Sequence, residues 1–354
     1  MDFRFSQDQL DFQGVVKSFL AGECTPEHLR NLLEVEARRD AGRWQKLTDI
    51  GLTGFFVPEG LGGMGLNELD FVLIAEACGA AALPETLVEQ AAVAAPLLAA
   101  CPVGEVRDKT LLSFVQGSMQ LALQLPNTRY VHDLHVAESL IFSGDDLSVR
   151  LSSRDQVSAT PQNSIDPFRR LFDVQVGDGE EIASDGSDIW ERAFERGALF
   201  SAAQLVGLAQ TMIDMAVTYT QQRPQFGKPN GSFQAVKHHL ASAQVSVSFA
   251  QPVVYRAAYA VAHNAPKMPA AVSHAKIAAG DAAMIASKAA LQCHGAMGYT
   301  FEAALHLWMK RSWALIGAWG DRDFHLKRVS DFVLGATMPT FADLACGVSD
   351  KSGF

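Results

Sequence analysis

Apolar residues recur at helical spacing near both ends of the chain and alternate with polar residues in its middle. A capping-box pair, Ser6 and Gln9, precedes the first helical run. Thr25-Pro26 opens a second run, with a cap residue followed by proline at the first helical position. These patterns predict an α-helical domain over residues 1–109.

The middle of the chain follows a different period. Between Thr110 and Asp188, short alternating runs such as QLALQL and LSVRLSS are separated by Gly, Asp, Asn and Pro. A period of two that is broken by turn residues is typical of half-buried antiparallel strands. We therefore expect a small β domain over residues 110–188.

Long helical runs return after Asp188. They cover residues 189–222, 232–264, 267–294, 303–319 and 322–334. Ser232 is the expected N-cap of the second run, and Pro252 is expected to kink it. Four main helices after a β domain predict a four-helix bundle over residues 189–340, followed by a tail over 341–354.

Composition narrows the class of protein. The 354 residues are 48% hydrophobic and 19% charged, and a net charge of −10 argues against a nucleic-acid-binding protein. We find no secretory signal pattern and no apolar run of membrane-spanning length, so we expect no membrane association. The cysteines are odd in number and lack CxxC spacing. This pattern predicts that they fill core positions in a protein of the reducing cytoplasm. They are Cys24, Cys78, Cys101, Cys293 and Cys346.

Two histidines in the β region could suggest a metal site. His132 and His135 are three residues apart in one predicted strand, so their side chains should point to opposite faces of the sheet. A shared metal needs ligands that converge. We therefore expect no metal site.

Candidate chemistry concentrates first in the stretch 221–240, QQRPQFGKPNGSFQAVKHHL. Its prolines and glycines end one long helix before the next begins. Arg223 stands at the helix end, where its guanidinium can bind a phosphate or carboxylate with two hydrogen bonds. Phe226 adds an aromatic ring. From the residues alone, an ordinary helix–helix turn with a solvated arginine is the favoured interpretation.

The second such stretch is 291–315, LQCHGAMGYTFEAALHLWMKRSWAL. Gly295 and Gly298 end a helix and permit close approach to the backbone. Gln292 and His294 lie beside them as possible polar contacts. Taken alone, a pair of glycines is weak evidence for a binding site.

Both stretches resemble the acyl-CoA dehydrogenase family. The first is similar to its R-x-x-FG-x-x-x-x-x-FQ pattern, the second to its Q-x-x-G-G-x-G-[YF] segment, and 57–66 to its V-P-E-x-x-G-G-x-G-L loop. The resemblance implies a mainly α fold with an N-terminal helical domain, a central β domain and a C-terminal four-helix bundle. It also implies FAD as cofactor, α,β-desaturation of an acyl-CoA thioester and an electron-transfer flavoprotein as electron acceptor. By the same resemblance, Arg223, Phe226, Gln234, Gln292 and Gly295 contact the FAD of a neighbouring subunit.

This sequence departs from the family where the reaction needs a base. Many members carry a glutamate in Y-E-G, and counting on from Gly298 puts Trp319 at that position. Others carry it on the helix before R-x-x-FG, where Gly197 stands here. A T-E-P-x-x-G-S-D-like loop, which holds the flavin ring in the family, is missing from the β region.

Three hypotheses follow from these departures. The favoured one is a subunit without a catalytic residue of its own, in a heteromer whose homologous partner carries the glutamate. Such a subunit resembles those of α2β2 acyl-CoA dehydrogenases of bacterial steroid side-chain degradation. In the second, the chain is self-sufficient and Asp321, Asp323 or Glu302 serves as base. In the third, it is a structural or regulatory subunit that binds no flavin.

Overall fold

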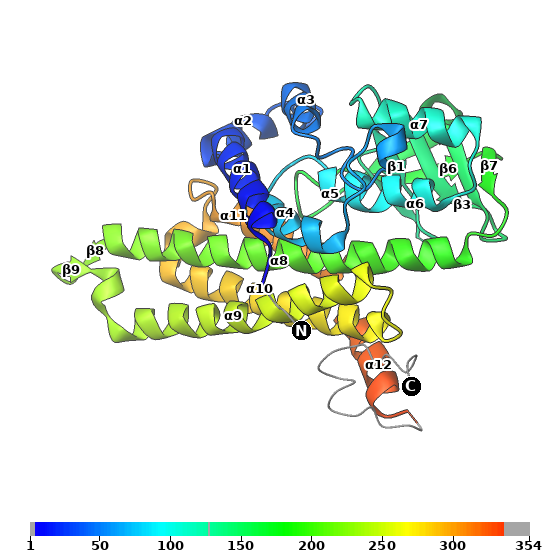
Figure 1. The fold of residues 1–354 in the computed structure, drawn as a ribbon. Coiled ribbons are helices and arrows are strands. Elements are labelled where there is room, and N and C mark those ends of the chain that lie inside the picture. Colours follow the sequence, from blue (N-terminus) through cyan, green and yellow to red (C-terminus); the bar gives the residue numbers. More distant parts are fainter. Residues whose placement is uncertain (1–3, 127, 336–354) are drawn as a thin grey trace. The chain divides into compact units, whose positions relative to one another are not determined.

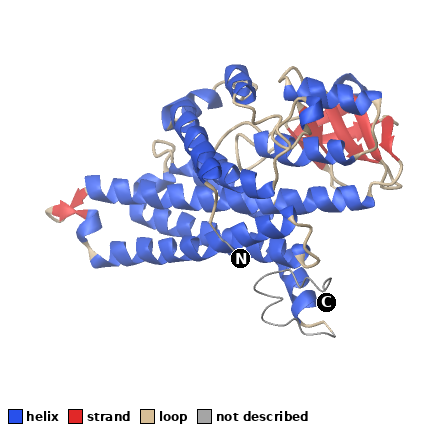
Figure 2. Cartoon of the chain, viewed as in Figure 1, coloured by secondary structure: helices blue, strands red, loops and turns tan. Residues whose placement is uncertain are grey.

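The computed structural model describes residues 4–126 and 128–335 (Figure 1). Helices come first, strands follow, and long helices end the chain, as the sequence predicts. Figure 2 distinguishes the helices from the strands. The expected tail 341–354 and Cys346 lie outside the described residues. By its internal contacts the chain divides into two compact units, Met1–Pro26, Glu68–Ala82 and Ala198–Phe354 in one, and Glu27–Asn67 and Leu83–Gly197 in the other.

The first unit is helical. Its elements are α1 (Gln7–Glu23), α4 (Glu68–Ala80), most of α8 (Ser187–Gln222), α9 (Gln234–Ala262), α10 (Met268–His294), α11 (Leu305–Gly317) and α12 (Arg322–Val333). Ser6 and Gln9 form the predicted capping box at the start of α1. The expected N-cap at Ser232 is wrong, because this residue ends a 3-10 turn and Phe233 stands at the cap position of α9. Helix α9 continues through Pro252.

Two glycines allow α4 and α8 to cross closely. A Cβ on Gly79 would lie 2.1 Å from the carbonyl oxygen of Gln204, and one on Gly207 would lie 2.0 Å from that of Glu76. No side chain fits at such distances. Ala80 is the last residue of α4, and its carbonyl oxygen accepts hydrogen bonds from Thr211 on α8 and Trp308 on α11. Backbone contact therefore fixes α8 along α4.

The second unit combines short helices with two small sheets. The helices are α2 (Pro26–Leu33), α3 (Ala41–Asp49), α5 (Leu87–Glu89), a π-helical segment (Gln90–Ala94), α6 (Ala95–Ala100) and α7 (Glu105–Val115). Helix α7 extends past Thr110, and the first strand begins only at Leu121. The strands therefore start later than the alternation suggested, because the run LLSFV within α7 also satisfies a helical period.

The sheets have the strand orders β1-β3-β4-β7 and β2-β6-β5. The strands are β1 (Leu121–Leu123), β2 (Tyr130–His132), β3 (Ser139–Ser143), β4 (Val149–Ser153), β5 (Val157–Gln162), β6 (Leu171–Val176) and β7 (Glu180–Ala183). The sheets share one apolar core, with Phe142 from the first and Val131 and Phe172 from the second. Pairing is antiparallel except for β1 and β3, which run parallel, so the prediction of a purely antiparallel domain is wrong at this pair.

The two histidines of this region have separate partners. His132 ends β2 and forms an ion pair with Glu89, with 2.6 Å between Nδ1 and Oε2. His135 lies beyond the strand, and its Nε2 donates to the carbonyl oxygen of Ala37. Within residues 4–126 and 128–335, no group of three or more potential metal-binding side chains occurs.

One sequence expectation about membranes needs correction. Helix α8 is long and apolar enough to cross a membrane, judged by length and composition, although 67% of its most apolar window is buried inside the protein. Burial against other helices accounts for this apolar character.

Cys24, Cys78 and Cys101 are buried free thiols, as expected, whereas Cys293 is half-buried.

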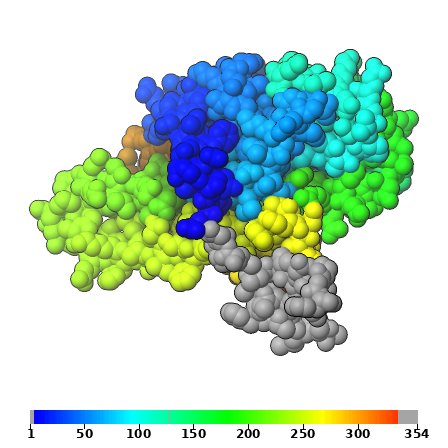
Figure 3. Space-filling view, in the orientation of Figure 1, coloured from blue at the N-terminus to red at the C-terminus, as the bar shows by residue number. Residues whose placement is uncertain are grey.

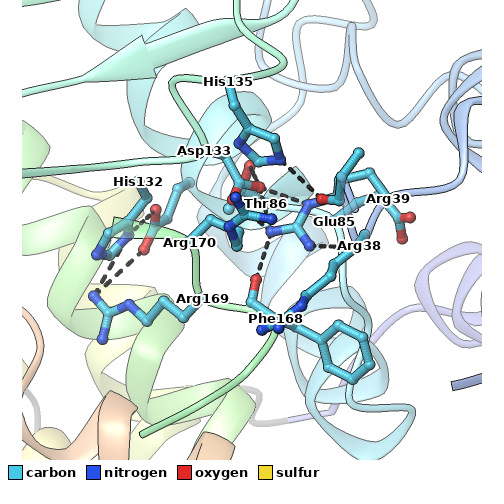
Figure 4. Close-up of polar contacts among 12 residues, drawn as sticks. Arg38, Arg39, Glu85, Thr86, His132, Asp133, His135, Phe168, Arg169 and Arg170 are labelled. Atoms are coloured by element: carbon cyan, nitrogen blue, oxygen red, sulfur yellow. Dashed lines mark hydrogen bonds and ion pairs between the residues drawn. The ribbon is translucent and has the colours of Figure 1, made fainter. Parts of the chain in front are cut away.

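A buried ion pair holds three loops of the second unit together (Figure 4). Arg39 donates to both carboxylate oxygens of Asp133, with 2.7 Å from Nε to Oδ2, and to the carbonyl oxygen of Phe168. The hydroxyl of Thr86 also donates to Asp133. The side chains of Arg39 and Asp133 are only 7% and 3% exposed. Their mutual pairing offsets the cost of removing both charges from water.

Replacing Arg39 should therefore destabilise the chain strongly. Arg39→Met leaves the Asp133 carboxylate buried without its main partner, and we expect a loss of about 3–5 kcal/mol in the free energy of unfolding. Urea denaturation measures this loss. The matched control is Arg129→Met, because the Arg129–Asp173 pair is solvent-exposed, with Arg129 70% exposed. The control should lose much less, because solvent screens an exposed pair, and equal losses would contradict the assignment.

Candidate functional site

A short β-hairpin joins α8 to α9. Strands β8 (Pro224–Gln225) and β9 (Lys228–Pro229) pair antiparallel, directly after Arg223, the first residue past the end of α8. The tip residues Phe226 and Gly227 both have positive φ, +52° and +78°. Two such residues in succession are typical of the tight turn that suits paired strands. The sequence predicted the turn but not the pairing.

Phe226 is held at this tip in an unfavourable way. Its side chain is 91% exposed, and a bulky residue at positive φ costs on the order of 1–2 kcal/mol. Inside the chain its ring meets only the edge of Phe233, at 6.2 Å between centroids, among the described contacts. A strained and exposed aromatic residue is a candidate for contact with another molecule.

The second predicted stretch begins where α10 ends. Gly295 follows the helix with φ +60° and ψ −140°, a conformation largely reserved for glycine. A Cβ built there would meet nothing within 4 Å, so the space beside this glycine is open. His294 is not the polar contact that the sequence suggested. It is buried, its Nδ1 donates to the carbonyl oxygen of Ala290, and burial lowers its pKa.

A ring stack brings the two stretches together. Tyr219 and His294 lie 4.4 Å apart between ring centroids, with an interplanar angle of 18°. Tyr219 is one helical turn before Arg223, and His294 directly precedes Gly295. The hairpin and the end of α10 therefore share one end of the bundle, at the left in Figure 1. In the space-filling view, the yellow-green hairpin region lies at the surface on that side (Figure 3).

The predicted contact residues fit a phosphate-bearing ligand. Arg223, Gln234 and Gln292 are all exposed, and their side chains make no hydrogen bond or ion pair with any residue that the structure describes. A guanidinium and two amides can satisfy phosphate and hydroxyl oxygens. Phe226 adds a ring face, and Gly295 leaves room for close backbone approach. The five residues thus form an open surface rather than a closed pocket, and their role stays a prediction.

Neither expected base position holds a carboxylate. Trp319 follows α11 in a left-handed conformation, with φ +58°. Gly197 is buried within α8. Asp321, one of the alternative bases, accepts a hydrogen bond from the backbone N–H of Phe324 at 2.9 Å and so caps α12. Asp323 lies in the first turn of the same helix, where a carboxylate stabilises the helix dipole. Glu302 is exposed.

A buried lysine and a buried histidine hold the backbone around Trp319, and no sequence pattern predicted them. Lys276, on α10, donates from Nζ to the carbonyl oxygens of Leu315 and Ile316 at 2.9 and 2.8 Å. His325, on α12, donates from Nε2 to the carbonyl oxygen of Trp319 at 2.9 Å. Burial lowers the pKa of His325 from about 6.5 to about 4, so the ring is neutral at pH 7. A lysine in an alanine-rich helix is normally predicted to be exposed, so the sequence pattern did not indicate that Lys276 is buried.

The lowered pKa of His325 makes stability depend on pH. Between about pH 6.5 and 4 the unfolded chain binds a proton at this histidine that the folded chain does not bind. The free energy of unfolding therefore falls as pH falls through this window. His325 should contribute a loss of roughly 2 kcal/mol between pH 7 and 5. Urea denaturation of wild type and His325→Gln at both pH values measures it. A pH-dependent loss of the same size in both proteins would contradict the assignment.

Comparison with known protein families identifies both helical parts of the chain. Residues 6–118 match "Acyl-CoA dehydrogenase, N-terminal domain", and residues 184–334 match "Acyl-CoA dehydrogenase, C-terminal domain". The chain is 30% identical over 298 residues to the acyl-CoA dehydrogenase IpdE2 of Mycobacterium tuberculosis (strain ATCC 25618 / H37Rv). This alignment covers 84% of this chain and 88% of IpdE2.

Solved structures share the fold over nearly the whole chain. One is the crystal structure of the ChsE4-ChsE5 complex from Mycobacterium tuberculosis, with a TM-score of 0.85, 24% identity, and 95% of this chain and 100% of that chain covered. Another is a variant of the steroid ACAD Tcur3481-Tcur3483, with a TM-score of 0.81, 21% identity, and 93% and 98% coverage. These likenesses confirm the predicted fold class.

Proposed function

Because the chain belongs to the acyl-CoA dehydrogenase family of FAD-dependent oxidoreductases, we propose that it is the subunit of a heteromeric enzyme that carries no catalytic base. Its homologous partner supplies the glutamate, in an α2β2 assembly. One observation carries the proposal: the five residues that the family resemblance assigns to flavin contact are present and exposed, while Trp319 and Gly197 stand at the expected base positions. ChsE4-ChsE5 and Tcur3481-Tcur3483 support it as related assemblies of two named chains.

The substrate of the proposed enzyme is an acyl-CoA thioester, with a steroid side chain as the favoured acyl group. The steroid ACAD among the similar structures supports this choice. An electron-transfer flavoprotein is the proposed acceptor, and the cytoplasm is the proposed location. The domain boundaries 1–109, 110–188 and 189–340 also remain proposals. The family matches over 6–118 and 184–334 support a helical part on each side of the β region, but α7 runs across the first boundary.

The residues of this chain act by binding and orientation. Bound FAD would supply the hydride acceptor for the β-carbon of the thioester, while a carboxylate takes the α-proton. Arg223 would neutralise the pyrophosphate of the partner's FAD, and Gln234 and Gln292 would bind its oxygens. Phe226 would pack on the adenosine part, and Gly295 would let the backbone approach. The proton is removed by the partner subunit.

The bundle offers a surface for that partner. Phe249 on α9 is 74% exposed, and Val245 on the same face and Ile285 on α10 are 53% and 43% exposed. Exposed apolar side chains on long helices are typical of interfaces between subunits. Gln234 begins α9 and Gln292 lies near the end of α10, so a partner bundle on this face would meet the flavin-contacting residues.

Arg223 should control retention of FAD by the assembled enzyme. In Arg223→Ala a charge-assisted hydrogen bond worth roughly 1.5–3 kcal/mol is lost, so the Kd for FAD should rise about ten- to a hundred-fold. Titration of the apo complex with FAD, followed by flavin fluorescence, measures the Kd. Lys237→Ala is the control, because Lys237 is an exposed cation on the first turn of α9. An unchanged Kd in Arg223→Ala would show that this arginine does not bind FAD and is an ordinary solvated surface residue.

The alternative bases should prove dispensable. Asp321→Asn, Asp323→Asn and Glu302→Gln should each leave turnover of the complex within a small factor of wild type, because the two aspartates already serve α12. Replacing the partner's catalytic glutamate by glutamine should lower turnover by about 10²–10⁴-fold. Steady-state kinetics with the thioester measures both. A comparable drop in any of the three variants, with FAD still bound, would favour the self-sufficient enzyme.

A further inference from the structure

The turn after α11 is held by side chains from three other helices. Lys276 Nζ bonds to the carbonyl oxygens of Leu315 and Ile316 and lies 3.5 Å from that of Gly320. On the other side, Ser201 on α8 donates to the carbonyl oxygen of Leu315 at 3.2 Å. These contacts satisfy the carbonyl groups that the end of α11 leaves without helical partners.

His325 completes the set with a defined ring orientation. Its Nε2 donates to the carbonyl oxygen of Trp319, so in the neutral ring Nδ1 is the acceptor, and the hydroxyl of Ser273 lies 3.1 Å from it. Asp321 caps α12 directly after the turn and fixes its far end. Every residue from Leu315 to Asp321 except Gly317 and Ala318 thus takes part in a bond to another element or in a cap.

The backbone held in this way is an unfavourable one. Trp319 and Gly320 are both left-handed, with φ +58° and +87°. Glycine accepts this conformation, whereas a bulky residue such as tryptophan adopts it only where its surroundings enforce it. A Cβ on Gly320 would lie 2.9 Å from Nε2 of His325, so the ring packs directly on the turn.

The cavity beside this network does not offer a better explanation. It has a volume of about 140 Å³ and is lined by Ile277, Gly280, Met284 and Ile316. Its polar neighbours are already engaged: Lys276 and His325 with the turn, and Asp281 with Arg322 in an ion pair. The four polar side chains that line it therefore already have partners within the chain. The buried lysine and histidine act on the turn instead.

We propose that Lys276 and His325 are positioning residues that force residue 319 into its left-handed conformation and so fix the direction of the Trp319 side chain. The importance of that direction rests on the proposed function, because residue 319 stands at the base position of the family. In this chain the same framework presents an indole instead of a carboxylate. The division of labour between the two subunits then depends on a rigid turn as well as on the identity of one residue.

Fluorine NMR of the full-length chain labelled with 5-fluorotryptophan tests this proposal. The chain has five tryptophans, and Trp319→Phe identifies the resonance of Trp319. In Lys276→Met and His325→Phe that resonance should shift toward the position of free 5-fluorotryptophan and change its width, while the other four stay in place. His325→Gln should restore the wild-type resonance, because its amide N–H can donate to the same carbonyl oxygen.

Lys288→Met is the matched control, because Lys288 is an exposed lysine on the same helix. It should leave all five resonances unchanged. A Trp319 resonance that is identical in wild type, Lys276→Met and His325→Phe would overturn the proposal. If Lys276→Met fails to fold, the contrast between His325→Phe and His325→Gln still decides. The measurement needs neither FAD nor a partner, so its outcome is separate from that of the proposed function.

Discussion

The ring stack between Tyr219 and His294 holds together the two helix ends that form the predicted binding surface of this chain. Arg223 and Gly295 are seventy-two positions apart in the sequence, and this stack places the helix ends that carry them side by side. It depends in turn on α8 being held rigidly along α4, where only glycine fits at positions 79 and 207. A binding surface assembled from exposed side chains can be accurate because the helices beneath it cannot slide.

The surface formed by the five predicted contact residues and the base position at Trp319 differ in how their side chains and backbone are held. At the hairpin, unpaired polar side chains and a strained phenylalanine face outward, an arrangement that costs stability and that contact with a ligand would offset. After α11, by contrast, each strained residue is locked from inside by buried donors. The first arrangement is typical of half of a shared site, and the second of a position whose geometry is kept although its carboxylate is absent. Together they favour a protein that completes the cofactor site of a neighbour.

Much of the fold was accessible from periodicity. The long helices, the β segment between them and the capping box of Ser6 were predicted from spacing and cap residues, because these signals act locally. Errors arose where local patterns are ambiguous: Thr110 lies in a run that satisfies a helical period, and Phe233 rather than Ser232 stands at the cap of α9. The parallel pairing of β1 with β3 could not be read from alternation, which is the same for both directions.

The site was predicted less from chemistry than from resemblance. An exposed arginine or glutamine carries no signal of its own, and only the shared pattern singled out Arg223, Gln234 and Gln292. The stack of Tyr219 on His294 and the burial of Lys276 are tertiary events between helices, so no spacing rule reveals them. His294 shows the converse error, because a histidine beside a glycine turn suggests a ligand contact, whereas its ring packs in the interior.

The role of this chain as half of a shared flavin site is tested most directly by its flavin content, purified alone and after co-expression with a homologous acyl-CoA dehydrogenase that carries the glutamate. Absorbance of bound flavin, measured against protein concentration, gives the stoichiometry in each case. We expect a colourless chain alone, and a yellow complex of both chains that contains FAD. A homomeric preparation of this chain alone, fully loaded with FAD and active on an acyl-CoA thioester, would contradict it.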